Sequence, residues 1–219
     1  MLPFMFLGFW TAEQIAVYLG LTQSNNMNLV NKIDSTILDK VVNFLYSYEG
    51  YASKAYNLGD GKITIGYGTT QWLSPTGTVL RAVKMGDTID QITARQQVYN
   101  YFVPAIPIFN MILAKNNYRV HPALLVALLQ TLYMTGQYSY NYSCFRDSLT
   151  RANGVTDTKK IASIYITETI ETLKTLKGGI AYYNKYALGW SRRVKAASDF
   201  IDGVIKPKIW YDKNFFTPY

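Results

Sequence analysis

Residues 49–70, EGYASKAYNLGDGKITIGYGTT, decide the fold of this chain. Asp60 and the glycines beside it are a tight-turn signal between two short runs of alternating character, 54–58 and 62–67. The segment therefore predicts a β-hairpin that directly follows a glutamate, Glu49. Thr64 lies in the second predicted strand, where its hydroxyl is suited to hold a water molecule, although threonine is also simply a good strand residue.

Glu49 is expected at the C-terminal end of a helix over residues 35–48. That helix would begin with a capping box, Thr36-x-x-Asp39, and would end at Gly50. Its apolar stripe is Leu38, Val41, Val42, Leu45 and Tyr48. Carbonyl dipoles at this end, and burial beside tyrosines, disfavour the ionised form of a carboxyl group. A protonated carboxyl is what general-acid cleavage of a glycosidic bond requires; the alternative is a solvated glutamate in a last helical turn.

The hairpin resembles the catalytic region of phage-type lysozymes, the muramidases of glycoside hydrolase family 24. The residues in register with that family's pattern are Glu49, Gly50, Ala55, Tyr56, Gly61, Thr64, Ile65, Gly66, Tyr67 and Gly68. Looser similarity covers residues 124–136, 143–154 and 188–200, so the resemblance spans roughly residues 36–205. It implies an α+β, lysozyme-like fold with a small β-hairpin lobe, a larger helical lobe and a cleft between them.

The resemblance also implies an activity and a site. Phage-type lysozymes hydrolyse the β-1,4 bond between N-acetylmuramic acid and N-acetylglucosamine in peptidoglycan, and no metal or cofactor is implied. Glu49 would be the acid, Asp60 the best available base, and Thr64 would place the water. Substrate-binding residues are expected at Tyr67, Thr70, Tyr133 and Ser143. Arg192 or Arg193 is a candidate partner for Glu49.

The sequence departs from the family at the second carboxylate. The family's catalytic aspartate aligns with Leu58, which cannot act as a base, and its histidine aligns with Thr69. Asp60 lies two residues further on, about 7 Å along an extended strand, so it replaces the aspartate only if the turn is remodelled, for instance by a bulge. Asn57 would position a water but not deprotonate it well. A second hypothesis is therefore a lysozyme-like virion or wall-binding protein with weak or lost catalysis.

The amino-acid composition limits the kinds of binding partner that the protein is expected to have. The net charge of +8 over 219 residues is consistent with acidic wall polymers, anionic membrane or nucleic acid. The basic residues are dispersed rather than clustered, so we do not expect nucleic acid. The single cysteine, Cys144, excludes an intrachain disulfide and a cysteine zinc site. The single histidine, His121, precedes Pro122 and is expected to cap a helix.

Further helices are expected over residues 88–103, 122–135, 156–173 and 191–205. The first would open with a Thr88-x-x-Gln91 box, the second is apolar nearly all round, and Ser143 is expected to cap another helical segment. These elements divide the chain into an N-terminal extension (1–35), a lysozyme-like domain (36–205) and a C-terminal tail (206–219).

The N-terminal extension has three interpretations. Its first ten residues are strongly apolar but too short to span a bilayer, and a short helix is expected over residues 12–19. Residues 1–21 would form a weak signal-anchor for the inner membrane, pack on the domain as an additional helix, which we favour, or dock the protein to a virion. The resemblance implies a phage-encoded protein that acts in the host periplasm or cell wall.

Overall fold

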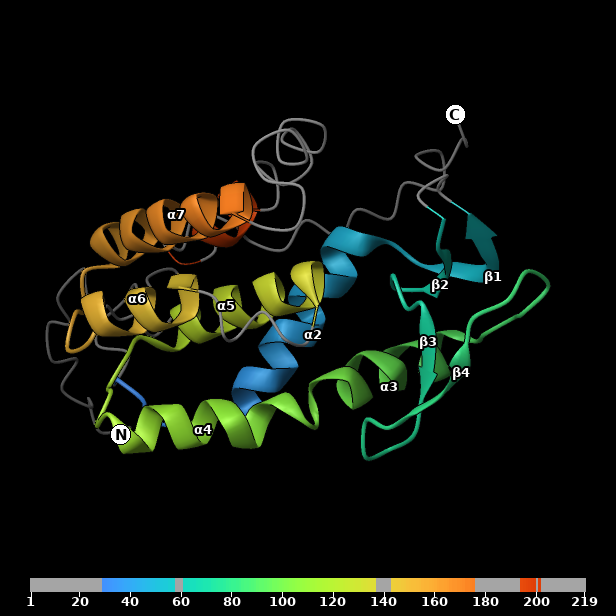
Figure 1. Ribbon diagram of the computed structural model, residues 1–219, viewed down its shortest axis with the longest axis horizontal. Helices are drawn as coiled ribbons and strands as arrows, with labels where there is room; N and C mark the ends of the chain where they lie inside the picture. Colours follow the sequence, from blue (N-terminus) through green and yellow to red (C-terminus); the bar gives the residue numbers. More distant parts are fainter. Residues whose placement is uncertain (1–28, 58–60, 137–142, 176–193, 200, 202–219) are drawn as a thin grey trace, which may run out of the picture.

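The computed structural model describes residues 29–57, 61–136, 143–175, 194–199 and 201. Along these residues a helix is followed by two small antiparallel sheets and then by a series of helices (Figure 1). The elements are α2 (Ser35–Glu49), β1 (Ala52–Asn57), β2 (Ile63–Gly66), β3 (Gln71–Leu73), β4 (Val79–Ala82), α3 (Gln91–Phe102), α4 (Ala105–Lys115), α5 (Pro122–Thr135), α6 (Ser143–Arg151) and α7 (Thr158–Thr175). Residues 194–199 are also helical. The predicted α+β, lysozyme-like fold is confirmed.

Helix α2 has a different N-terminal cap from the one predicted. Asp34 is the N-cap, and its carboxylate accepts a hydrogen bond of 3.0 Å from the backbone N–H of Ile37. The predicted Thr36-x-x-Asp39 box is therefore wrong, because Asp34 already satisfies a free N–H of the first turn. Asp39 instead accepts a hydrogen bond from the hydroxyl of Tyr99 on α3.

Strands β1 and β2 form the predicted hairpin. Tyr56 pairs with Thr64 and Asn57 with Ile63, and the register shifts nearer the start of β1. Strand β1 begins earlier than residue 54, and β2 is shorter than the predicted run 62–67. The turn itself, residues 58–60, lies outside the described residues.

A second hairpin, β3–β4, was not predicted. Its register places Trp72 opposite Arg81, and the Arg81 guanidinium lies over the Trp72 ring, 5.2 Å from the ring centre. The Asp87 carboxylate accepts hydrogen bonds from the Trp72 indole at 2.9 Å and from Arg81 at 2.7 Å. The Asp87 carbonyl accepts a further bond, of 3.0 Å, from the backbone N–H of Ala55 in β1. Asp87 thus ties the two sheets together.

Helices α3 and α4 differ from expectation at their starts. Asp90 caps α3 by accepting from the backbone N–H and the hydroxyl of Thr93. The predicted Thr88 box is wrong, because Thr88 is extended and forms a β-bridge with Lys54. Helix α4 was not predicted; it starts immediately after Pro104, a position at which proline's fixed φ and missing N–H are tolerated.

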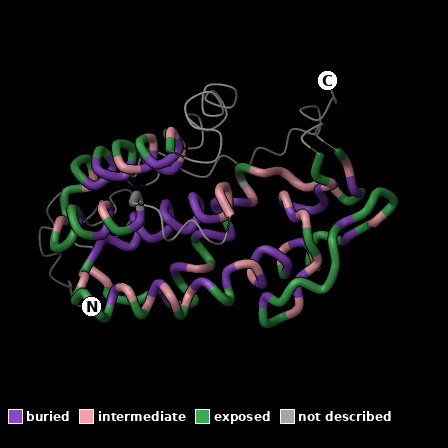
Figure 2. The backbone as a smooth tube through the Cα atoms, in the orientation of Figure 1, coloured by how far each residue is buried: buried purple, intermediate pink, exposed green. Residues whose placement is uncertain are grey.

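Helix α5 is the centre of the core and occupies the predicted residues. Every residue from Pro122 to Leu132 is buried, and α5 packs against both α2 and α7 (Figure 2). The His121 ring caps α5 as predicted, with Nδ1 accepting a hydrogen bond of 3.2 Å from Ala123 N–H. The tight packing of α2 on this helix follows from its own buried stripe, Val41, Val42 and Leu45.

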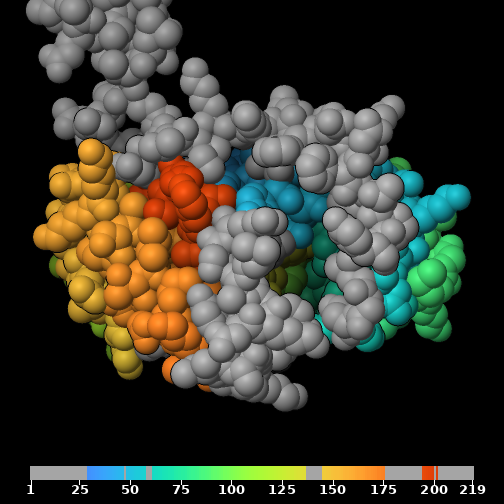
Figure 3. Space-filling view, turned by 90° about the horizontal axis from the view of Figure 1, so that it is seen from above, coloured from blue at the N-terminus to red at the C-terminus, as the bar shows by residue number. Residues whose placement is uncertain are grey.

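The strands lie at one end of the molecule and helices α6 and α7 at the other (Figures 1 and 3). Helix α2 runs between the two ends and leads into β1, so its last residue, Glu49, lies at their junction. Among the described residues, no helix is both long and apolar enough to cross a membrane.

The remaining predicted elements are found with shifted bounds. Helix α7 covers Thr158–Thr175 rather than 156–173. Ser143 already lies within α6, so the prediction that it precedes and caps the helix is wrong. Residues 1–28 and 206–219 lie outside the described part of the chain. The three interpretations of the N-terminal extension therefore stay predictions.

Candidate active site

Glu49 is held where the chain turns from helix α2 into strand β1. Gly50 follows it with a φ of 67°, a left-handed conformation that favours glycine, and so ends the helix. Glu49 is partly exposed. Its backbone is therefore anchored in a core helix, while the side chain keeps access to the surface.

The carboxyl group of Glu49 lies beside a tight turn at residues 66–68. A Cβ added to Gly68 would lie 3.5 Å from Oε2 of Glu49 and 3.6 Å from Cε1 of Tyr133. Gly68 has a φ of 93°, which L side chains rarely adopt. Helix α2, the turn after β2 and helix α5 meet at this glycine.

Backbone hydrogen bonds close this turn, and α3 supports it. Ile65 and Thr69 exchange two hydrogen bonds, each of 2.9 Å, across the three residues between them. A Cβ added to Gly66 would lie 3.0 Å from Cβ of Ala94 on α3, closer than nearly all real Cβ contacts. Gly66 also has a positive φ, 64°. Both positions therefore require glycine: Gly66 packs closely on α3, and Gly68 faces Glu49.

Tyr133, near the end of α5, fixes the turn through its hydroxyl. The hydroxyl donates a hydrogen bond of 2.8 Å to the carbonyl of Tyr67. The side chain of Thr69 bonds to the same hydroxyl and must be the donor, because the single phenolic proton already points to that carbonyl. Burial raises the pKa of Tyr133 above its ordinary value, so the group stays a protonated donor at neutral pH.

The ring of Tyr67 supports the turn from the core side. It is stacked on Tyr46 of α2, with ring centres 4.2 Å apart, and its hydroxyl accepts a hydrogen bond of 2.9 Å from Gln91 of α3. Tyr51 packs against it at an angle, 5.6 Å away. Because only 2% of Tyr67 is exposed, its ring offers little surface to a sugar. Substrate contact by Tyr67 stays a prediction.

Comparison with known families supports the resemblance to phage-type lysozymes. The sequence model of phage lysozymes matches residues 46–175, more than half of the chain. The chain belongs to the phage lysozyme family. No curated protein sequence matches it. Membership implies a phage-encoded muramidase, a glycosidase that acts on peptidoglycan, and the matched range includes Glu49, both hairpins and helices α3 to α7.

Two other predicted site residues of this phage lysozyme lie on or just after β2. Thr64 is 6% exposed and pairs with Tyr56, and its hydroxyl makes no hydrogen bond with any residue in the described part of the chain. That hydroxyl has bonding capacity left for a water. Thr70 is partly exposed, and its carbonyl accepts a hydrogen bond of 3.0 Å from Val83 N–H. Their roles stay predictions.

Several predicted residues lie outside the described part of the phage lysozyme chain. Leu58, Asp60, Arg192 and Arg193 are among them, and so is the side chain of Ser143. Asn57, the other polar candidate, is exposed at the end of β1. Within the described ranges, no three histidine, cysteine, aspartate or glutamate residues are grouped as a metal site would require.

Sequence reasoning missed two residues that position the site of this phage lysozyme. Tyr101 packs edge-on against Tyr133, with ring centres 4.8 Å apart, and donates a hydrogen bond of 3.1 Å to the carbonyl of Leu132. Nothing distinguishes Tyr101 among 19 tyrosines in the sequence. Thr69 was noted only because the resemblance aligns it with the family's histidine, and its bond to Tyr133 was not predicted.

Proposed function

We propose that this protein is an active muramidase that cleaves the β-1,4 bond between N-acetylmuramic acid and N-acetylglucosamine. The observation that carries the proposal is the setting of Glu49. Its helix is packed on the core, its side chain is partly exposed, and its carboxyl group lies beside the Gly68 turn. A partly exposed carboxyl group beside a fixed turn suits proton donation to a polymeric substrate.

The proposed reaction needs one acid, one water and one base. Glu49 donates its proton to the glycosidic oxygen as the bond from that oxygen to the anomeric carbon breaks. A water held by the Thr64 hydroxyl attacks the same carbon, and its proton passes to the Asp60 carboxylate. Direct attack by water inverts the configuration at that carbon.

The rest of the site supports this assignment. Tyr133 and Thr69 hold the turn beside Glu49, so the surroundings of the acid are set before substrate arrives. The net charge of +8 favours approach to anionic wall polymers.

The test is cleavage of purified peptidoglycan by the wild type, Glu49→Gln and Asp60→Asn, with new reducing ends on muramic acid identified by mass spectrometry. We expect Glu49→Gln to lower the rate by at least about 100-fold. Glu171→Gln, an exposed acid on α7, is the matched control and should keep full activity. Activity that survives Glu49→Gln would overturn the mechanism. Activity that is lost in Glu49→Gln but kept in Asp60→Asn would exclude only Asp60 as the base.

The second candidate is a lysozyme-like virion or wall-binding protein with weak or lost catalysis. The observation that favours it is Leu58, which stands where the family has its aspartate. Folded wild-type protein that sediments with peptidoglycan but releases no reducing ends would favour this alternative.

We further propose that the enzyme degrades the host wall for the phage, in the periplasm or cell wall. For residues 1–21 we favour packing on the domain as an additional helix; the alternatives are that they attach the protein to the inner membrane or to the virion. Immunoblots of purified particles and of host membrane and soluble fractions, with and without those residues, would test this. Equal distribution of both forms would contradict a docking role for the segment.

A further inference from the structure

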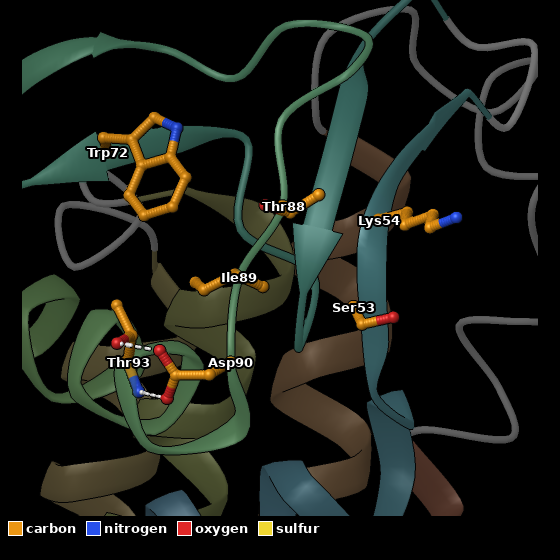
Figure 4. Close-up of a pocket in the computed structure, with 7 residues that line it drawn as sticks. All are labelled: Ser53, Lys54, Trp72, Thr88, Ile89, Asp90 and Thr93. Atoms are coloured by element: carbon orange, nitrogen blue, oxygen red, sulfur yellow. Dashed lines mark hydrogen bonds between the residues drawn. The ribbon is translucent and has the colours of Figure 1, made fainter.

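A cavity of about 430 Å³ opens on the strand end of the molecule, between β1, β3 and the start of α3 (Figure 4). It is lined by Ser53 and Lys54 of β1, Trp72 of β3, residues 88–90 and Thr93. Glu49, Thr64 and Tyr133 do not line it. The cavity is therefore separate from the proposed catalytic acid.

Hydrogen bonds from both sheets hold the walls of this cavity in place. The backbone N–H of Ile89 donates a hydrogen bond of 3.0 Å to the carbonyl of Ser53. The β-bridge between Lys54 and Thr88 holds the segment before α3 alongside β1. Trp72 is held from the other side by its bond to Asp87. Figure 4 shows the Trp72 ring projecting from β3 toward the segment that carries Ile89. A site built in this way loses little freedom when a ligand binds.

The groups in the lining suit a neutral ligand with many hydroxyls. The Thr93 hydroxyl and N–H hold the pKa of Asp90 below its usual range, so Asp90 is an ionised acceptor with bonding capacity to spare. Figure 4 shows the Lys54 side chain pointing away from Trp72 and Asp90, so the negative charge of Asp90 disfavours an anionic ligand. The Trp72 ring supplies an apolar surface for the face of a sugar ring. A volume of about 430 Å³ lies within the range of small-molecule sites.

We propose that this cavity is an accessory saccharide site that holds an uncharged N-acetylglucosamine unit of a glycan strand. The negative charge of Asp90 favours that sugar over N-acetylmuramic acid, which bears a carboxylate or a peptide. Ser53 follows Glu49 by four residues, so their Cα atoms lie at most about 14 Å apart. The site therefore holds wall polymer close to the acid; the inference rests on the proposed function for the identity of the polymer.

The test is an NMR titration of the full chain with the N-acetylglucosamine tetramer, in a Glu49→Gln background that prevents hydrolysis. The Trp72 indole resonance is assigned with Trp72→Phe. We expect that resonance and the amides of Ser53 and Thr88 to shift in a saturable way.

Two matched variants separate the cavity from the helix cap. Asp90→Ser keeps an N-cap but removes the carboxylate, and should weaken tetramer binding by about tenfold or more. Asp34→Ser makes the same change at the cap of α2, away from the cavity, and should leave binding unchanged.

Four results would overturn the proposal: no saturable shift of the Trp72 resonance, shifts confined to residues 66–70, equal weakening by the two cap variants, or a response to a free stem peptide but not to the tetramer. Peptidoglycan cleavage by the wild type is measured in parallel. Cleavage without a Trp72 response removes only the accessory site, whereas a Trp72 response without cleavage removes the proposed enzymatic function and leaves the saccharide site.

Discussion

The Tyr133 hydroxyl donates a hydrogen bond of 2.8 Å to the backbone carbonyl of Tyr67. This bond joins the core helix α5 to the turn beside Glu49, and the Thr69 side chain bonds to the same hydroxyl. The position of the turn, and with it the setting of the acid, depends on a residue more than 60 positions away in the sequence.

Tyr133→Phe is expected to lower both stability and activity. Loss of the hydroxyl leaves the buried Tyr67 carbonyl without this donor, at a cost of about 1–3 kcal/mol in unfolding free energy. The turn then shifts relative to Glu49, and kcat should fall by about tenfold to a hundredfold. Denaturant unfolding and the reducing-end assay measure the two effects.

Tyr101→Phe is the control for that variant. It also removes a hydroxyl bonded to a carbonyl, but Leu132 still accepts a hydrogen bond from Gly136 N–H. Because phenylalanine keeps the ring that packs on Tyr133, the kcat of this variant should stay close to the wild-type value. Equal losses of kcat in the two variants would contradict a specific role for Tyr133.

Gly68→Ala and Gly86→Ala should differ in activity but not in backbone strain. Both glycines have a φ of 93°, so alanine at either position costs about 1–3 kcal/mol in stability. An added Cβ meets Glu49 and Tyr133 at Gly68 but nothing within 4 Å at Gly86. We therefore expect only Gly68→Ala to lower kcat. Comparable kcat values in two variants of similar stability would show that Glu49 does not depend on this close approach.

His121 makes the fold sensitive to mild acid. Burial and the nearby charge of Lys40 lower the pKa of His121 from its ordinary 6.5. Because the unfolded chain then binds the proton more readily than the folded one, stability is complete above about pH 6.5 and falls below it, by at most about 1.4 kcal/mol per pH unit. Unfolding curves between pH 7 and pH 5 measure the slope.

His121→Ser provides the comparison, because serine can cap α5 without titrating in this range. Its stability should change less between pH 7 and pH 5 than that of the wild type. Parallel slopes for the two proteins would assign the acid sensitivity to other groups.

Asp87 should titrate far below an ordinary aspartate. Hydrogen bonds from Arg81, Trp72 and the Lys84 N–H hold its pKa below 3.8. Its stabilising effect is present above that pH and is lost as the pH falls below it. A carboxyl-carbon NMR titration checks the midpoint.

Asp87→Asn should also loosen the second hairpin, seen as faster hydrogen exchange of the Trp72 indole N–H. Asp147→Asn, which breaks an exposed ion pair on α6, is the control and should leave that exchange rate unchanged. Unchanged exchange in Asp87→Asn would show that the hairpin does not depend on this carboxylate.

Local signals in the sequence were enough to predict helix α5 and the β1–β2 hairpin, two elements that carry site residues. Helix α5 has Pro122 at its start, a sequence that is apolar nearly all round and Gly136 directly after it, so both of its ends could be predicted. The β1–β2 hairpin followed from its turn residues, although the described structure omits the turn. The turn that contains Gly66 and Gly68 was not predicted, because residues 62–67 were expected to be a strand; the structure gives the reasons for both glycines, namely Ala94 under one and Glu49 beside the other.

Other features depend on competition or on distant contacts and could not be predicted in this way. For both α2 and α3, a threonine box was predicted a few residues from an aspartate that is the actual cap, because several nearby side chains compete for the same N–H groups. Strands β3 and β4 have only three and four residues, too few for a periodic signal. Tyr133 was predicted only as a substrate-binding residue, a role that stays a prediction, whereas its bond to the Tyr67 carbonyl depends on the tertiary fold.

Tyr133 belongs to the same helix that forms the centre of the core, and this links the durability of the enzyme to that of its site. A loop-borne support would let the site fail while the rest of the protein stayed folded. Here the support comes from α5, so heat should abolish activity and secondary structure along a single curve. The temperature at which activity is lost should then equal the melting temperature of the protein, which depends on how well α5 is packed.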